Sequence, residues 1–243
     1  MVDIHCHILP EVDDGAGSWD IAVEMCRMAA QDGITHIVAT PHANHQYSYD
    51  RDRHLGAVQE LMARSGGVPE IQLGCDFHFS YDNVQDALAN PSRYVLGNSN
   101  YLLVELSDYS IAPSFLETLR QLMQVGLRPV ITHPERNLLL RQRPELVLDW
   151  AEQGIIVQVT ANSLTGHWGR TAKKTARWLL ERKAVHVLAT DAHDTQRRPP
   201  LLSPACQVMC EWVGEQVTQA LVEQNPAAML RSEDLPYFEK PER

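Results

Sequence analysis

The chain contains 243 residues, of which 44% are hydrophobic, and carries a formal net charge of −10. This length is enough for one large domain with a full core, so we expect a single α/β domain over residues 1–243. The acid excess argues against a general nucleic-acid or anionic-membrane binder, but an anionic substrate remains compatible because bound metal ions reverse the local charge of a site.

Strand-like and helix-like stretches alternate along the chain. The expected strands cover residues 1–7, 34–40, 71–77, 101–106, 128–132, 155–159 and 185–190. The expected helices cover residues 18–31, 51–64, 83–89, 113–125, 144–154 and 170–181, followed by a mostly helical segment at 204–223 and a loosely held charged tail at 236–243. Because the connections are too long for hairpins, about seven strands, each followed by a helix, predict a parallel barrel.

The cysteines and the amino end of the chain bear on its location. Five cysteines, an odd number without Cys-x-x-Cys spacing, predict neither a disulfide framework nor a zinc ribbon. The first expected strand begins at Met1 with no basic segment and apolar stretch before it, and no apolar run is long enough to span a bilayer. We therefore expect a cytoplasmic protein with reduced thiols and no membrane insertion.

Candidate metal ligands stand at the carboxyl ends of the expected strands. His5 and His7 form a His-x-His pair whose side chains point to the same side of a strand and can hold one ion. Other strand ends supply the remaining candidates, which are His42, Asp76, Glu105, His133, Asp191 and His193. In a parallel barrel these ends meet on the face where barrel enzymes assemble their active sites, so we expect one cluster.

The types of residue in this set indicate metal-dependent hydrolysis. Histidine nitrogens mixed with carboxylates suit Mn²⁺, Fe²⁺ or Zn²⁺. A single catalytic zinc needs only about three protein ligands, so the larger set points to more than one ion. Neighbouring ions activate a water molecule and neutralise the attacking and leaving oxygens of a phosphate ester.

Two arginines favour a phosphorylated substrate. Arg136 follows His133 by three residues and Arg198 follows His193 by five, so both arise from loops of the predicted active face. A guanidinium group matches phosphate oxygens in a bidentate way, which ranks phosphate above a neutral amide. We expect Arg136 and Arg198 to bind the phosphoryl group, with Arg197 as the alternative to Arg198.

Several motifs of the chain resemble those of a known superfamily. They are His5-Cys6-His7-Ile8-Leu9-Pro10, Val12-Asp13-Asp14-Gly15-Ala16, Ala39-Thr40-Pro41-His42, His133-Pro134-Glu135-Arg136-Asn137 and Asp191-Ala192-His193. Through them the chain resembles, over essentially residues 1–235, the PHP (polymerase and histidinol phosphatase) superfamily. More narrowly, it is similar to the bacterial manganese-dependent tyrosine-protein phosphatases of capsular and exopolysaccharide biosynthesis.

The resemblance implies a distorted (β/α)7 TIM-like barrel, the PHP fold, that holds two or three divalent ions. Mn²⁺ is the implied metal, with iron, zinc or magnesium as further candidates. Carried over by position, the implied ligands are His5, His7, Asp14, His42, Asp76, Glu105, His133, Asp191 and His193, with Arg136 and Arg198 at the phosphate. Asp13 is the alternative to Asp14 if the loop register differs by one. The implied partner is a phosphotyrosine protein, a bacterial tyrosine kinase of polysaccharide export.

The chain departs from the family pattern at Asp76. The family presents Gly-x-Glu where this chain has Gly74-Cys75-Asp76, so a carboxylate expected to bridge two ions is shorter by one methylene. His78 lies further along the same side of the strand and is an additional candidate ligand, with a structural role as the alternative. His45 is near enough to His42 in the sequence to be a candidate substrate contact.

Direct hydrolysis by a metal-activated water is the mechanism that these residues favour. A cysteine phosphatase would need an arginine six positions after its cysteine, and none of the five cysteines has one. A small-molecule phosphoesterase of the histidinol-phosphatase type would use the same metal site and stays an alternative. A nuclease would need a basic track, which a net charge of −10 does not offer. The non-enzymatic alternative is a metal-binding module, which would have a closed ligand shell.

Overall fold

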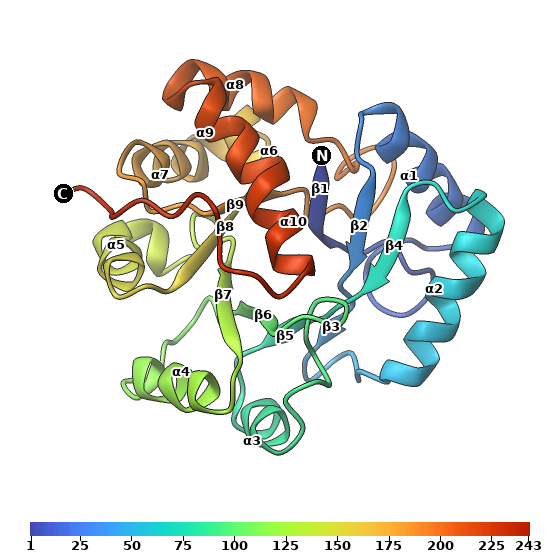
Figure 1. Ribbon diagram of the computed structural model, residues 1–243, viewed down its shortest axis with the longest axis horizontal. Helices are drawn as coiled ribbons and strands as arrows, with labels where there is room; N and C mark the ends of the chain where they lie inside the picture. The colour runs from blue at the N-terminus through green and yellow to red at the C-terminus, as the bar shows by residue number, and fades with distance from the viewer.

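Nine parallel strands form the core of the protein, and the computed structural model describes all of residues 1–243 (Figure 1). The strands are β1 (Val2–Cys6), β2 (His36–Ala39), β3 (His42–Ala43), β4 (Glu70–Leu73), β5 (Asp76–His78), β6 (Tyr101–Glu105), β7 (Arg128–Thr132), β8 (Ile156–Thr160) and β9 (Val187–Ala189). One sheet has the order β1-β2-β4, and the other has the order β3-β5-β6-β7-β8-β9.

The two sheets together form one barrel. β2 leads directly into β3 and β4 leads into β5, so the nine strands occupy seven positions around the ring. Every pairing between strands is parallel. A parallel bridge between Cys6 and Ala192 joins the end of β1 to the segment after β9 and closes the ring. The predicted α/β barrel with seven strand positions is therefore confirmed.

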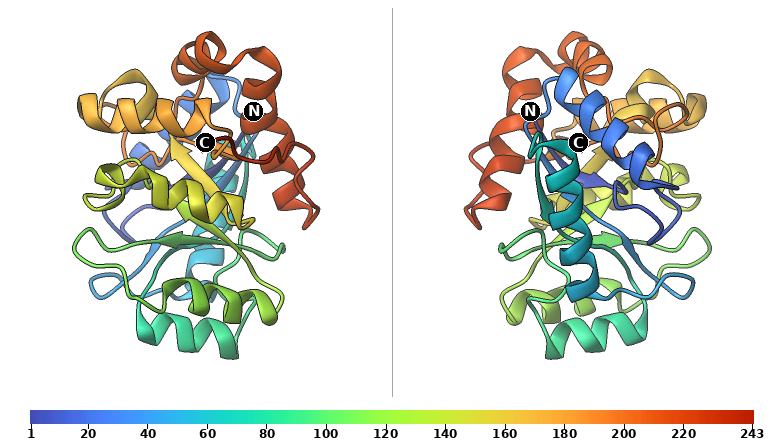
Figure 2. Two further views of the ribbon diagram at one scale, coloured as in Figure 1. Left: turned by 90° about the vertical axis from the view of Figure 1, so that its left-hand side faces the viewer. Right: turned by 90° about the vertical axis from the view of Figure 1, so that its right-hand side faces the viewer.

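Helices surround this barrel, as the side views in Figure 2 show. They are α1 (Trp19–Gln31), α2 (Arg51–Ser65), α3 (Tyr81–Ala89), α4 (Phe115–Gln124), α5 (Pro144–Glu152), α6 (Ala161–Thr165), α7 (Gly169–Glu181), α8 (Ser203–Val213), α9 (Glu215–Gln219) and α10 (Asn225–Leu230), with the short turns η1 (Leu140–Gln142) and η2 (Ala220–Gln224). A cluster of 53 buried apolar residues connects the helices to the outer side of the strands. None of the helices combines the length and the apolar character needed to cross a bilayer.

A second apolar cluster fills the amino end of the barrel. Its 11 buried members include Val2, Tyr101 and Val187, the first residues of their strands, together with Met229 of α10. Helix α10 therefore closes this end, and in Figure 1 it lies in front of the strands. Since apolar side chains occupy the amino end, the carboxyl end of the strands is left for polar chemistry.

Side-chain caps fix the start of three helices. The side chains of Ser18, Asp50 and Ser80 each accept a hydrogen bond from the backbone N–H three residues later, at the starts of α1, α2 and α3. Helix α2 ends at Gly66, which has φ of +74° and so adopts the left-handed conformation that favours glycine. These local signals explain why the predicted and observed boundaries of α1 and α2 agree closely.

A register shift in β1 determines which way its histidines point. Val2 and Ile4 belong to the inner cluster, whereas Cys6 belongs to the outer one. Strict alternation would put all three on the same side, but the pairing with β2 shifts between Asp3 and Cys6. Beyond this irregularity the inner side of the strand presents histidine, and Cys6 points away from it, as the sequence predicted.

The predicted single strand at 71–77 is wrong. The structure divides it into β4 and β5, which belong to different sheets. Gly74 lies at the break, where a Cβ atom would come within 2.8 Å of the Val38 side chain, so a larger residue would displace its neighbours. Beyond the break, Asp76 of β5 pairs with His42 of β3. The change of sheet therefore places these two candidate ligands next to each other.

The predicted helical segment at 204–223 is also divided. Gly214, with φ of +86°, separates α8 from α9, and the π-helical turn η2 precedes α10. A glycine in this conformation ends a regular helix, which the sequence analysis did not take into account. The short helix α6 and the two-residue strand β3 were not predicted either.

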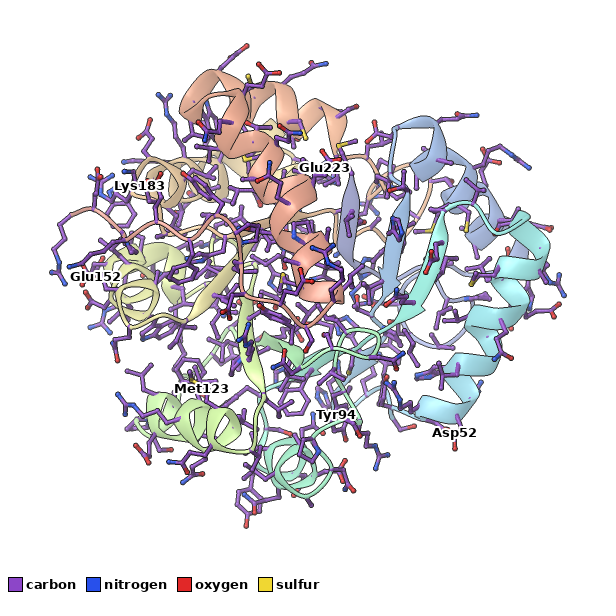
Figure 3. The ribbon with its side chains drawn as sticks, in the orientation of Figure 1. Asp52, Tyr94, Met123, Glu152, Lys183 and Glu223 are labelled. Carbon is purple, nitrogen blue, oxygen red and sulfur yellow. The ribbon has the colours of Figure 1, made fainter.

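The predicted loose tail at 236–243 is wrong as well. The segment has no regular secondary structure, yet ion pairs hold its end against the helical layer. Arg243 Nη2 lies 2.8 Å from Glu152 Oε2 of α5, and Lys183 Nζ lies 2.6 Å from Glu242 Oε1. Figure 3 labels Glu152 and Lys183 at the edge of the molecule, where the tail passes. Charge pairing that links distant segments is not visible in a sequence pattern.

Candidate metal centre

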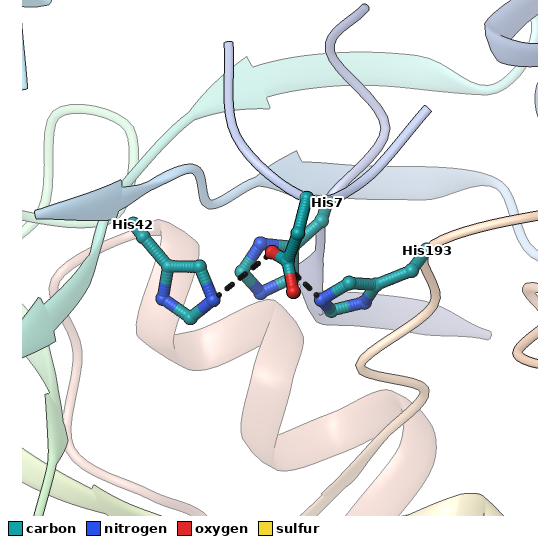
Figure 4. Close-up of side chains that lie close together, drawn as sticks. His7, His42 and His193 are labelled. Atoms are coloured by element: carbon teal, nitrogen blue, oxygen red, sulfur yellow. Dashed lines mark ion pairs between the residues drawn. The ribbon is translucent and has the colours of Figure 1, made fainter. Parts of the chain in front are cut away.

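Histidines and carboxylates gather at the carboxyl end of the barrel in three groups that could hold metal ions. The first group consists of His7, Asp14, His42 and His193. Asp14 Oδ1 lies 3.3 Å from His42 Nε2 and 3.4 Å from His193 Nε2. Figure 4 shows the three imidazoles of this group around one carboxylate. Residues that are far apart in the sequence thus form one small donor set.

The second and third groups share residues with the first. His5, His7 and Asp76 form the second group, in which the two Nε2 atoms are 3.2 Å apart and His5 Nε2 is 3.6 Å from Asp76 Oδ2. His42, Asp76 and Glu105 form the third, with His42 Nδ1 at 3.2 Å from Asp76 Oδ2 and 3.8 Å from Glu105 Oε2. Because the groups overlap, cations held by them would be close neighbours.

Two further predicted ligands lie beside these groups but belong to none of them. His133 Nε2 is 3.9 Å from Glu105 Oε1. Asp191 Oδ1 is 3.5 Å from the Nε2 atoms of both His5 and His7. His133 and Asp191 have φ of +34° and +51°, an uncommon conformation for residues other than glycine that is often found at functional sites. The structure therefore brings all nine predicted metal ligands to one end of the barrel.

Buried atoms without hydrogen-bond partners indicate that this donor set fits cations. Both carboxylate oxygens of Asp76 and Nδ1 of His42 are buried and make no hydrogen bond of acceptable geometry, although His42 Nδ1 and Asp76 Oδ2 are within ion-pair distance. A buried carboxylate without partners is costly. A divalent cation would satisfy these atoms, and mixed imidazole and carboxylate donors suit Mn²⁺, Fe²⁺ or Zn²⁺.

The carboxylates of the cluster attract positive charge strongly. Burial lowers the pKa of His5, but the carboxylates of Asp76 and Asp191 outweigh this effect and raise that pKa to about 9. Burial also opposes the charging of His42, whose pKa is nevertheless raised to about 11, mainly by the carboxylates of Asp14 and Asp76 beside its two ring nitrogens. The carboxylates around His5 and His42 therefore favour positive charge at this position, which a bound divalent cation would supply in place of the protons.

His7 stays neutral, and Asp13 fixes its orientation. Burial and the neighbouring His193 lower the pKa of His7 to about 3. Asp13 Oδ2 lies 2.8 Å from His7 Nδ1, which leaves the Nε2 lone pair free to face the cluster. The backbone N–H of Gly15 donates to Asp13 Oδ1 at 2.9 Å, and a Cβ atom at Gly15 would overlap the His7 carbonyl oxygen. The Val-Asp-Asp-Gly motif is therefore a support for His7.

This geometry distinguishes the two aspartates that the sequence left as alternatives. The Asp14 side chain is 49% exposed and belongs to a donor group, whereas the Asp13 side chain is fully buried. Asp13 also accepts a hydrogen bond from the backbone N–H of His42 at 3.1 Å. The structure favours Asp14 as a candidate ligand and Asp13 as a residue that orients one.

The two predicted phosphate-binding arginines converge, and the sequence analysis missed the residue that holds them. Arg136 and Arg198 both pair with Asp191 Oδ2, the latter through Nη2 at 2.7 Å. Trp168 lies under both guanidinium groups, with their Cζ atoms 4.0 Å and 5.2 Å from the centre of its ring. A single tryptophan in the turn between α6 and α7 gives no local signal of this role, because it lies far from both arginines in the sequence.

Glu135, the acid of the His-Pro-Glu-Arg motif, anchors the loop that carries two site residues. Its Oε1 accepts hydrogen bonds from the Thr160 backbone N–H at 3.0 Å and from the Ser163 hydroxyl at 2.6 Å. The side chain is fully buried, and burial raises its pKa to about 7. The four residues of the motif thus include one candidate metal ligand, one phosphate-binding arginine candidate and one buried anchor.

The cluster opens on a cavity of about 640 Å³, called here the catalytic cavity. Glu105, His133 and Arg136 line it together with His45 and His78. His78 Nδ1 is 3.4 Å from Glu105 Oε2 but belongs to none of the three donor groups, so the structure places it beside the candidate ligands. His45 lies at the cavity wall, and its predicted contact with substrate stays a prediction.

The chain is similar to proteins of capsular polysaccharide synthesis. A family model described as capsular polysaccharide synthesis, CpsB/CapC, matches residues 1–231. The tyrosine-protein phosphatase YwqE of Bacillus subtilis (strain 168) is 34% identical over 239 residues, which cover 97% of this chain and 93% of the relative. The tyrosine-protein phosphatase CpsB of Streptococcus pneumoniae is 26% identical over 239 residues, with 95% and 98% covered.

Solved structures agree with these matches. A chain from the crystal structures of YwqE from Bacillus subtilis and CpsB from Streptococcus pneumoniae, described as unique metal-dependent tyrosine phosphatases, has a TM-score of 0.92 and 31% identity. The likeness covers 100% of this chain and 98% of that one. The lactonase Lmo2620 from Listeria monocytogenes has a TM-score of 0.63 at 12% identity, which shows a likeness of fold alone.

Proposed function

Because the chain belongs to the CpsB/CapC family of capsular polysaccharide synthesis, we propose that it is a metal-dependent tyrosine-protein phosphatase. The matched region, residues 1–231, includes every candidate site residue, and the structural likeness extends over the whole chain. The resemblance seen in the sequence motifs is confirmed at the level of the family. Phosphotyrosine therefore ranks above histidinol phosphate as the substrate, and an enzyme ranks above a metal-binding module.

One observation carries this proposal. Asp191 links the donor groups to the two arginines, because its Oδ1 contacts His5 and His7 while its Oδ2 pairs with Arg136 and Arg198. Glu105 of the third donor group and Arg136 also line the same cavity. Cation-binding groups next to paired guanidinium groups are suited to metal-dependent hydrolysis of a phosphate monoester. A structural metal site would have no use for the arginines.

We propose that the metal is held by His5, His7, Asp14, His42, Asp76, Glu105, His133, Asp191 and His193. The overlap of the three donor groups supports two or three neighbouring ions, for which Mn²⁺ is our first choice, with iron, zinc or magnesium as alternatives. When bound, such ions supply Lewis acidity that polarises a phosphoryl oxygen and makes a water molecule more nucleophilic. The pairing of β5 with β3 brings the carboxylate of the shorter Asp76 to 3.2 Å from His42 Nδ1, so it stays within reach of the third donor group.

Arg136 and Arg198 are proposed to bind and orient the phosphoryl group. Both guanidinium groups are about four-fifths buried, so their N–H donors are directed by the surrounding protein rather than by solvent. A phosphate dianion in the catalytic cavity would compete with Asp191 for these donors and offers more acceptor oxygens. Trp168 keeps the two groups stacked, which limits the ordering that phosphate binding would otherwise require.

The thiols take no part in this chemistry. Cys6 and Cys75, the two cysteines next to candidate ligands, are fully buried, and burial raises the pKa of each well above its usual range. A buried neutral thiol is a poor nucleophile. Both lie on the outer side of the strands in the large apolar cluster, as the sequence predicted.

The finer assignments extend this proposal. We propose that the physiological substrate is a phosphotyrosine protein, a bacterial tyrosine kinase of polysaccharide export, since the family acts in capsule synthesis. We also propose that residues 1–243 act as one PHP phosphatase domain, which the packing of both chain ends on one barrel supports. A cytoplasmic location is our further proposal, which the five free thiols support.

The test combines metal removal with a substrate panel. Chelation should abolish hydrolysis of an aryl phosphate and of a phosphotyrosine peptide, and Mn²⁺ should restore both, while phosphoserine peptide and histidinol phosphate should be poor substrates. Thiol alkylation should have little effect. An enzyme that keeps its activity after chelation and loses it on alkylation would contradict the proposed function.

A further inference from the structure

A second cavity lies beside the catalytic cavity, and its lining is positively charged. It has a volume of about 480 Å³ between the start of α5 and the first turns of α7. Its lining includes Arg141, Arg170, Lys174, Thr175 and Trp178. We call it the cationic cavity, and we propose that it binds an acidic segment of the substrate polypeptide next to the phosphotyrosine. This inference rests on the proposed function.

The charge of the cationic cavity is not neutralised by the protein. No carboxylate lines it, and Arg141, Arg170 and Lys174 make no ion pair, although the chain as a whole has a net charge of −10. By contrast, Arg177 on the same helix pairs with Glu181 at 2.7 Å. Unpaired cations concentrated in a concave site on an acidic protein attract anions selectively.

The start of α7 adds to this positive field. The backbone N–H groups of the first turn of any helix lack partners within the helix, and in this helix of 13 residues no side chain caps them. The helix dipole places a partial positive charge at the same end. The aromatic ring of Trp178 supplies apolar lining beside the charges, as expected for a site that binds peptide rather than a free ion.

The position of the cationic cavity relates it to catalysis. Arg141 lines both this cavity and the catalytic cavity, so the two adjoin. Trp168, which supports the two phosphate-binding arginines, directly precedes α7. A substrate polypeptide whose phosphotyrosine occupies the catalytic cavity can therefore extend over Arg141 into the cationic cavity.

The opposite side of the catalytic cavity has a different character. A cavity of about 690 Å³ there shares His78, Leu106 and Ser107 with the catalytic cavity. Its lining is rich in serine, threonine and glutamine and includes Glu117, but contains no lysine or arginine. The asymmetry predicts that acidic residues are preferred on one side of the phosphotyrosine only.

The test uses phosphotyrosine peptides and two charge-matched variants. The two peptides of each pair differ only in carrying glutamates or glutamines. In one pair these residues precede the phosphotyrosine, and in the other they follow it. The double variant Arg170→Ser/Lys174→Ser is compared with Arg27→Ser/Arg231→Ser, which removes the same charge from exposed positions outside both cavities. Each enzyme, loaded with Mn²⁺, is assayed for KM and kcat on the peptides and on an aryl phosphate.

In one of the two pairs, we expect the parent enzyme to have a KM about tenfold lower for the glutamate peptide than for the glutamine peptide at low salt, with little change in kcat. The preference should disappear in Arg170→Ser/Lys174→Ser and persist in the control, while aryl phosphate hydrolysis is the same in all three. An active parent enzyme without any preference, or a preference that survives in Arg170→Ser/Lys174→Ser, would overturn the inference. Failure of the proposed function would instead appear as a parent enzyme inactive on every substrate.

Discussion

Substitution of Asp13 provides a sharp test of how the Val-Asp-Asp-Gly loop works. Its carboxylate accepts from the backbone amides of His42 and Gly15 at 3.1 Å and 2.9 Å and bonds His7 Nδ1 at 2.8 Å. Asp13→Asn keeps the size of the side chain but removes the negative charge. His7, which belongs to two of the three donor groups, then loses the partner that directs its Nε2 toward the cluster.

The size of the effect follows from these bonds. A hydrogen bond to a charged group contributes about 1.5–3 kcal/mol, against about 1 kcal/mol for a neutral one, so the substitution should cost about 1–2 kcal/mol. This cost corresponds to a loss of metal affinity of about tenfold. Because no donor atom of the cluster is removed, activity at saturating metal should stay close to that of the parent.

The assay is a Mn²⁺ titration of chelated enzyme, with aryl phosphate hydrolysis and bound metal measured together. Asp13→Asn should shift the half-saturating Mn²⁺ concentration about tenfold and reach nearly the parent kcat. Asp14→Asn, the matched control, should bind fewer ions and stay slow at any Mn²⁺ concentration, because Asp14 belongs to a donor group. The reverse result, with Asp13→Asn beyond rescue and Asp14→Asn like the parent, would refute this reading of the loop.

Three further predictions concern other parts of the molecule. Trp168→Leu should lower kcat/KM about tenfold or more with unchanged metal content, and Trp168→Phe should lower kcat/KM less. Near-parent activity of Trp168→Leu would contradict the stacking role. Asp76→Asn should reduce the number of bound ions and the activity, and parent metal content with parent turnover would show that Asp76 is not a ligand. Burial lowers the pKa of His186 to about 3, whereas an unfolded histidine titrates near its ordinary value of about 6.5. Below about pH 6.5 the unfolded chain therefore binds a proton that the folded chain does not. The free energy of unfolding should fall as the pH drops through this range, by up to about 1.4 kcal/mol per pH unit. Urea titrations between about pH 5 and pH 7 should show a weaker pH dependence for His186→Gln but not for the exposed control His167→Gln, and parallel curves for His186→Gln and the parent would exclude this contribution.

The sequence was sufficient to predict the barrel and the end at which its chemistry lies. Buried parallel strands are nearly continuous apolar runs, so a polar residue where such a run ends is conspicuous, as with Glu105 at the end of β6 and His133 after β7. Parallel strands also carry all their carboxyl ends to one face. These two facts require no knowledge of which strands are neighbours, and they placed the candidate ligands on one face.

Three features of the site required the folded structure. The register shift in β1 depends on its pairing with β2, and the division of the predicted strand at 71–77 depends on two sheets meeting at Gly74. The different roles of Asp13 and Asp14 depend on which carboxylate reaches His7. In each case the local pattern is compatible with more than one arrangement, and packing against a distant segment selects one.

The contacts between loops could be predicted least. Trp168 stacks on arginines from two other loops, and Arg141 lines two cavities because the start of α5 packs beside α7. Secondary-structure periodicity records whether a residue faces the core, but it contains no information about which partner it meets there. Local propensity and alternation therefore define the strands and their polar ends, whereas stacking, ion pairing and cavity shape arise from the long-range closure of the barrel.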